Sequence, residues 1–172
     1  MKKVTINLYS FAELSDDAKQ KALEKLWDLN VDHEWWEFIY EDAENVGVRI
    51  KGFDLDRHTI DGDFISDAVA EKILKDHGEN CETFKTAKNY YTEYDKLVEK
   101  YSDGKVLNKV AEDNEYEFDK EADELAEEFQ DNILEDYLSM LRQEYEYQTS
   151  EEAIIESIEA NEYQFTEDGE LY

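Results

Sequence analysis

Apolar and polar residues alternate at the start of the chain and then recur at helical spacing. Val4, Ile6 and Leu8 alternate with polar residues, a pattern that predicts a half-buried strand over residues 4–9. Ser15 then predicts a helix start, because its hydroxyl can cap the first turn and the two aspartates after it suit the positive end of the helix dipole. The apolar face of this helix comprises Ala18, Ala22, Leu23, Leu26 and Leu29.

A second helix is predicted over residues 32–46, with Asp32 as its cap and Gly47 ending it in the left-handed conformation. Trp35 and Trp36 are adjacent, so on a helix they point about 100° apart and both are hard to bury fully in a small domain. Tryptophan is enriched at binding hot spots, which makes Trp36 a candidate anchor for a partner. A position in or near the core is the alternative for each tryptophan.

The next segments predict a β-hairpin and a short helix. Residues 48–56 alternate again and favour a strand with a bulge at Gly52, and residues 58–65 favour its hairpin partner. Ser66 and Asp67 then cap a helix that ends near His77 and Gly78.

Two long helices follow, and each carries an apolar stripe. The first is predicted over residues 83–101 and the second over residues 119–147, with a break at Asp103-Gly104. The stripe of the first comprises Phe84, Ala87, Tyr91, Tyr94, Val98 and Tyr101, which faces another helix or closes a homodimer. The stripe of the second comprises Ala122, Leu125, Phe129, Ile133, Tyr137 and Leu141.

The chain closes with a helix that Ser150 caps and that runs to Ala160, followed by a strand or hairpin over residues 163–172. The order of elements predicts an α+β fold: a small antiparallel sheet packed by helices, with a long acidic helical hairpin in the C-terminal half. No linker rich in proline or glycine divides the chain, so we expect one domain over residues 1–172. The alternative is a boundary near residues 103–104.

Composition favours a folded protein. The chain has 172 residues, enough for a core without disulfides or metals, and 13% of them are aromatic, unlike acidic disordered chains. Cys81 is the single cysteine, which excludes an internal disulfide and fits a reducing compartment. We see no signal peptide and no apolar run near the roughly 18 residues that span a bilayer. We therefore expect a cytoplasmic protein.

Residues suited to catalysis are few: His33, His58, His77 and Cys81. His77 and Cys81 fit either a nucleophile and base pair or a helix end beside a small buried residue. Four aspartates, Asp54, Asp56, Asp61 and Asp63, fit either a Ca²⁺ or Mg²⁺ site or a polar strand face, and they do not match the EF-hand loop. We predict no enzyme activity and no cofactor.

Charge is the most informative property of the chain. The formal net charge is −29, and residues 112–172 hold 23 acidic residues against the two bases Lys120 and Arg142. Such a surface repels nucleic acid and anionic membranes and attracts cationic partners. On the last long helix, one face carries carboxylates at spacings of three and four residues: Glu124, Glu127, Glu128, Asp131 and Glu135.

A carboxylate at each turn of a rigid helix imitates a track of DNA phosphates, because four helical residues advance about 6 Å and the phosphates of one strand lie about 3.4 Å apart along the axis. Like charges four residues apart cost a few tenths of a kcal/mol each. A stripe kept for solubility alone tolerates interspersed lysines. The alternative is a solvated face without a partner.

Three stretches are familiar together: residues 11–19 (FAELSDDAK), residues 35–43 (WWEFIYEDA) continuing to residues 52–57 (GFDLDR), and residues 160–169 (ANEYQFTEDG). They resemble a family of small acidic proteins that bacteriophages and prophages encode and that have no assigned function. The resemblance touches both ends of the chain and carries no catalytic residues. It implies a viral accessory protein in a bacterial cytoplasm. Acidic DNA mimics of phages match the chain in charge only, so that step is an analogy.

The function predicted from these patterns is a non-enzymatic inhibitor of a host defence enzyme of the restriction or CRISPR type. The carboxylate stripe is expected to occupy the nucleic-acid groove of a basic host protein, with Trp36 or Tyr137 as an aromatic anchor. The alternative is a protein interaction module that binds through an aromatic helical surface, with the acidic charge serving solubility.

Overall fold

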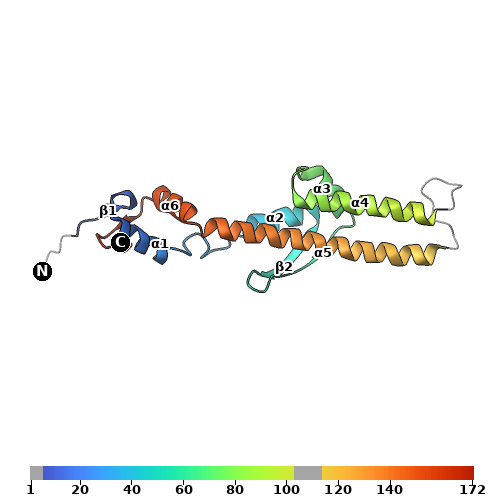
Figure 1. Ribbon diagram of the computed structural model, residues 1–172, viewed down its shortest axis with the longest axis horizontal. Coiled ribbons are helices and arrows are strands. Elements are labelled where there is room, and N and C mark those ends of the chain that lie inside the picture. Colours follow the sequence, from blue (N-terminus) through green and yellow to red (C-terminus); the bar gives the residue numbers. More distant parts are fainter. Residues whose placement is uncertain (1–5, 103–113) are drawn as a thin grey trace. The chain divides into compact units, whose positions relative to one another are not determined.

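The computed structural model describes residues 6–102 and 114–172 and confirms the α+β class (Figure 1). Contacts group the chain into two compact units. We call Met1–Glu37 with Arg142–Tyr172 the terminal unit, and Phe38–Leu141 the central unit. Whether they act as one domain stays a prediction, and the alternative boundary near residues 103–104 lies outside the described residues.

The terminal unit joins the two ends of the sequence. It contains strand β1 (Tyr9–Ser10), the 3₁₀ helix η1 (Phe11–Glu13), helix α1 (Asp16–Lys25), helix α6 (Glu151–Ala160) and strand β4 (Gln164–Phe165). β1 pairs with β4 in antiparallel register, with Tyr9 opposite Phe165. The predicted strand over residues 4–9 is wrong in its bounds, because residues 6–8 are not in a strand and β1 covers only Tyr9–Ser10. Residues 4 and 5 lie outside the described residues.

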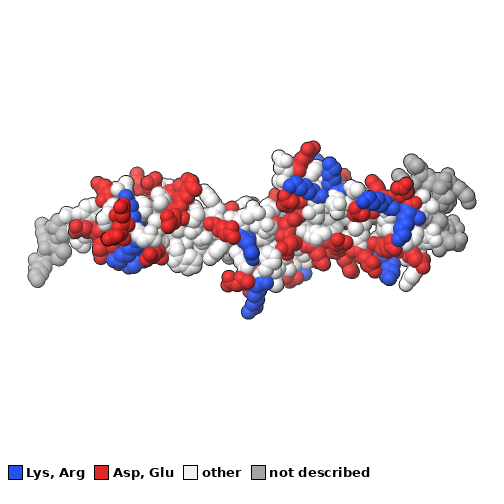
Figure 2. All heavy atoms as spheres, viewed as in Figure 1, with Lys and Arg blue, Asp and Glu red and all other residues white. Residues whose placement is uncertain are grey.

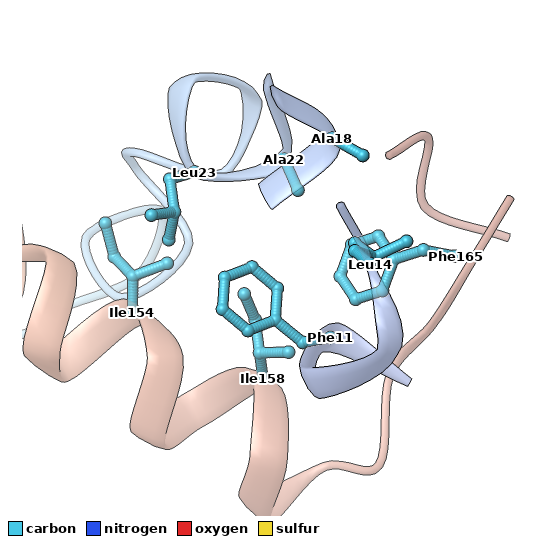
Figure 3. Close-up of a cluster of buried hydrophobic side chains, with 8 residues drawn as sticks. All are labelled: Phe11, Leu14, Ala18, Ala22, Leu23, Ile154, Ile158 and Phe165. Carbon is cyan, nitrogen blue, oxygen red and sulfur yellow. The ribbon is translucent and has the colours of Figure 1, made fainter. Parts of the chain in front are cut away.

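Both predicted serine caps of this unit are confirmed. The Ser15 hydroxyl accepts from the Ala18 amide, and the Ser150 hydroxyl accepts from the Ala153 amide, each at 3.3 Å. The apolar faces of α1 and α6 pack in one cluster, and Phe11 of η1 lies between them (Figure 3). The cluster of buried side chains comprises Phe11, Leu14, Ala18, Ala22, Leu23, Ile154, Ile158 and Phe165.

The central unit combines a β-hairpin with helices. It contains helix α2 (Glu37–Val46), strands β2 (Val48–Asp54) and β3 (Thr59–Phe64), helix α3 (Val69–Asp76), helix α4 (Glu82–Tyr101) and most of helix α5 (Glu115–Gln148). The predicted left-handed Gly47 and the predicted bulge are both confirmed, with φ +94° at Gly47 and a register shift between Ile50 and Gly52.

Helices α4 and α5 form the predicted hairpin (Figure 1). The Tyr90 and Phe129 rings stack with their centroids 4.4 Å apart, and Thr86 donates to Asp136 at 2.7 Å. Tyr91, predicted in the seam, is 40% exposed, so the seam is rotated from the prediction. The inward-facing side chains are Thr83, Ala87, Tyr90, Tyr94, Leu97 and Tyr101.

The predicted start of the second helix is also wrong. Residues 27–36 form turns and bends, and α2 begins at Glu37 rather than after Asp32. The Trp35 amide donates to the His33 carbonyl at 2.8 Å, and the Trp35 side chain is buried with its ring 5.6 Å from that of Tyr145. Burial of Trp35 therefore prevails over the local helix signal. In the part of the chain that the structure describes, no helix is long and apolar enough to cross a membrane.

Candidate functional site

The carboxylates predicted on one face of α5 do lie on its exposed side. Figure 2 shows acidic side chains gathered along this helix. The opposite side of α5 is buried, with Phe129 at 6% exposure and Ile133 at 0%. We call the five exposed residues the acidic ridge: Glu124, Glu127, Glu128, Asp131 and Glu135.

The middle of the ridge has no counter-ion. Glu127, Glu128 and Asp131 form no ion pair within residues 6–102 and 114–172, although they repel neighbours four residues away. Lys120 contacts Glu124 at one end, with 3.7 Å between the charged atoms. The helix rises about 1.5 Å per residue, so the ridge extends for roughly 16 Å. It is a rigid row of negative charge held by a packed helix.

The other end of the ridge meets the β2–β3 turn. His58 Nε2 lies 2.6 Å from Glu135 Oε1, and both side chains are about half exposed. His58 has a φ of +54°, a left-handed conformation that a side chain rarely adopts. Sequence reasoning missed this contact because 77 residues separate the two. The turn therefore marks where the row of unpaired carboxylates ends.

Three of the four lysines of α4 pair with carboxylates outside the ridge. Lys85 pairs with Glu82, Lys96 with Glu93, and Lys100 with Glu121, all at 2.6–2.7 Å. The hydrogen bonds from Lys100, and then from the Tyr101 hydroxyl, lower the pKa of Glu121. None of these three lysines pairs with a ridge carboxylate, although Lys96 and Lys100 line a hollow together with Glu124 and Glu128.

The two predicted aromatic anchors, Tyr137 and Trp36, differ in burial and in the unit to which they belong. Tyr137 is fully buried and its hydroxyl donates to Asp42 at 2.9 Å, so it is not an anchor. Trp36 is half-buried in the terminal unit, whereas the ridge belongs to the central unit. Trp35 and Trp36 both precede α2, which begins at Glu37. Helical geometry therefore does not set the angle between these two side chains. Trp27 and Phe38 are each 53% exposed, more than the half-buried Trp36.

The other candidates are held by local contacts. Asp63 pairs with Lys51 at 2.6 Å, which lowers the pKa of this carboxyl, and Asp54 accepts from the Arg57 amide at 2.9 Å. Among residues 6–102 and 114–172, no three His, Cys, Asp or Glu side chains are grouped so as to hold a metal ion. The aspartates at positions 54, 56, 61 and 63 therefore fit a polar hairpin surface.

His77 and Cys81 differ sharply in exposure. The His77 side chain is 9% exposed, its Nδ1 lies 2.7 Å from the Thr83 hydroxyl, and its Nε2 lies 3.6 Å from Asp42. Cys81 is exposed at the N-terminus of α4. The imidazole therefore joins α3, α4 and α2 within the central unit. No protein-family model, curated protein or solved structure matches the chain.

Proposed function

We propose that this protein is a non-enzymatic inhibitor that mimics nucleic acid with its acidic ridge and blocks a basic, nucleic-acid-binding host protein. The observation that carries the proposal is the row of exposed carboxylates at Glu127, Glu128 and Asp131, which have no counter-ion in the described residues. Buried side chains fix the helix beneath them, so the charges are ordered before a partner arrives.

The charge of the ridge matches what a nucleic-acid groove recognises. A groove lined with Lys and Arg binds phosphates mainly through charge and releases counter-ions as it does so. A row of carboxylates about 16 Å long offers the same sign of charge at a comparable spacing. The field of the remaining acidic surface attracts the same partner and speeds association.

The class of target follows from the resemblance to phage-encoded acidic proteins. A phage protein that occupies a basic groove in the bacterial cytoplasm has a restriction or CRISPR enzyme as its natural target. This step rests on family analogy rather than on any motif.

The second candidate function is a protein interaction module that uses aromatic side chains, with the acidic charge serving solubility. The exposure of Trp27 and Phe38 favours it, because exposed Trp and Phe are enriched at the centres of protein interfaces. In that case, alanine at Trp27, Trp36 or Phe38 weakens binding more than charge reversal on the ridge does.

The experiment is capture of a partner from bacterial lysate by the immobilised full chain at low salt, elution with a salt gradient, and identification by mass spectrometry. The proposal expects a nucleic-acid-binding protein that elutes at moderate salt and that duplex DNA displaces in competition. A partner that resists high salt and is indifferent to DNA contradicts mimicry and supports the aromatic module.

A further inference from the structure

Two hollows lie along the surface between α4 and α5, and they share three lining residues. One has a volume of about 230 Å³ and the other about 420 Å³. Glu93, Leu125 and Glu128 line both. The hollows therefore join at a point where one carboxylate comes from each helix, and Glu128 belongs at once to the ridge and to this junction.

The smaller hollow offers an aromatic wall and polar side chains. Its lining includes Tyr90 and Phe129, whose rings stack at an interplanar angle of 20°. Asn89 and Asn132 contribute amides from opposite helices, and neither makes a side-chain hydrogen bond within residues 6–102 and 114–172. The hollow therefore presents aromatic side chains beside amide groups that make no side-chain hydrogen bond in the described residues.

Acidic side chains outnumber basic ones by one around the two hollows: Glu93, Glu121, Glu124 and Glu128 against Lys85, Lys96 and Lys100. Lys100 pairs with Glu121. Lys85 lines the smaller hollow but pairs with Glu82. Lys96 contacts one oxygen of Glu93, Oε1, at 2.7 Å. Glu128 has no ion pair in the part of the chain that the structure describes. An entering cation therefore meets at least one carboxylate that no lysine has neutralised.

We infer that the junction between the two hollows binds an arginine side chain of the partner, an inference that rests on the proposed function. A guanidinium is planar, stacks on aromatic rings and forms forked hydrogen bonds with a carboxylate. Glu128 accepts the forked hydrogen bonds, the guanidinium packs against the stacked Tyr90–Phe129 pair, and the oxygens of Asn89 and Asn132 accept from the remaining N–H groups. A lysine ammonium is a strongly hydrated point charge that uses neither the wall nor the fork.

The test titrates the labelled full chain with N-acetyl-arginine amide and, separately, N-acetyl-lysine amide, which carry equal charge. The readout is the NMR signals of the Asn89 and Asn132 side-chain amides. We expect saturable shifts at these residues with the arginine probe and weaker, unsaturated shifts with the lysine probe. Equal responses to both probes, shifts spread evenly along the ridge, or no shifts at all overturn the inference.

A matched pair of variants sharpens the test. Glu128→Gln removes the charge from the junction, and Glu127→Gln removes an equal charge from the ridge outside the hollows. We expect arginine affinity to fall about tenfold in the first and less than about twofold in the second. Equal losses contradict the inference. Both variants keep the other ridge carboxylates, so partner capture by the ridge persists even if the junction binds no arginine, and the two ideas fail separately.

Discussion

Two lysines of α1 in the terminal unit and the carboxylates in the middle of the ridge in the central unit differ in whether their charge is paired. In the terminal unit, Lys21 and Lys25 of α1 both contact Glu170 near the C-terminus, which joins segments about 145 residues apart. In the central unit, three ridge carboxylates have no partner in the described residues. The chain has only 18 lysines and arginines for 47 aspartates and glutamates. Among these bases, Lys21 and Lys25 lie where they join distant segments. The charges of Glu127, Glu128 and Asp131 therefore form no ion pair that stabilises the described fold, and this motivates the proposal that they serve binding.

The largest effect is expected from Gly169→Ala in the terminal unit. Gly169 has φ +82°, and an added Cβ would lie 2.2 Å from the Ala18 carbonyl oxygen. We expect the free energy of unfolding to fall by about 2–4 kcal/mol, measured by urea unfolding. All three tryptophans, Trp27, Trp35 and Trp36, belong to this unit, so their fluorescence reports its unfolding.

The control for that substitution is Gly52→Ala in the central unit, where an added Cβ meets no atom within 4 Å. We expect it to change stability by less than about 1 kcal/mol, followed by circular dichroism. Equal losses in the two variants would contradict the close approach of the Gly169 turn to α1.

Tyr137→Phe comes next and probes the core of the central unit. The buried hydroxyl donates to Asp42, and burial, followed by the charge of Asp42, raises the pKa of the phenol, so it stays neutral. We expect a loss of about 1 kcal/mol in thermal unfolding experiments. Tyr147→Phe removes an exposed contact with Glu156 in the terminal unit and should cost nearly nothing. A larger loss of stability in Tyr147→Phe than in Tyr137→Phe would contradict the stabilising role of the buried Tyr137 hydroxyl.

The carboxylates of Asp136 and Glu170 should affect thermal stability with opposite sign as the pH changes. Burial raises the pKa of Asp136, so its ionisation costs stability in full above its folded pKa, and this cost is gone below its unfolded pKa. Asp136→Asn, which still accepts from Thr86, should raise the Tm by about 1–2 °C at pH 7 and by nothing at pH 3. Hydrogen bonds from Lys25 and then Lys21 lower the pKa of Glu170.

Glu170 therefore stabilises the fold above its unfolded pKa, and that contribution is lost as the pH falls through its folded pKa. Glu170→Gln should lower the Tm at pH 7 and lower it less at pH 3. The measurement is a series of thermal melts of both variants and wild type between pH 3 and pH 7. Tm shifts of the same sign in both variants at pH 7 would contradict the opposite effects expected for Asp136 and Glu170.

The smallest effect on stability is expected from Glu127→Lys on the ridge. It removes the repulsion with Asp131 and should raise the free energy of unfolding by about 0.2–0.5 kcal/mol. The same substitution should weaken partner binding, which is the mark of a residue kept for function at a cost in stability. Glu41→Lys on the exposed side of α2 is the control. A destabilised Glu127→Lys variant would contradict the assignment.

Local signals in the sequence predicted the local parts of the fold. Ser15 and Ser150 cap helices through hydroxyls that act within three residues, so their roles need no tertiary information. Gly47 takes the left-handed conformation for an equally local reason. The exposed ridge also followed from periodicity, because one side of α5 is apolar and the opposite side acidic.

Features set by distant contacts were not predictable. Residues 83–101 support two seams that share Ala87, Tyr94 and Tyr101, and stacking of Tyr90 on Phe129 decides between them. Asp32 is a reasonable helix cap, yet burial of Trp35 beside Tyr145 displaces the helix start by several residues. The contact of His58 with Glu135 and the hollows between α4 and α5 were also not predictable, because each depends on residues far apart in the sequence.

The most direct test of the central claim compares two triple charge reversals in binding to the partner captured from lysate. One places lysine at Glu127, Glu128 and Asp131. The other places lysine at Glu41, Glu44 and Glu71, exposed residues of α2 and α3, and changes the net charge equally. Nucleic-acid mimicry predicts that the ridge variant stays folded and loses at least about a hundredfold in affinity, whereas the control loses only a few-fold. Equal losses, or a ridge variant that binds like wild type, would contradict it.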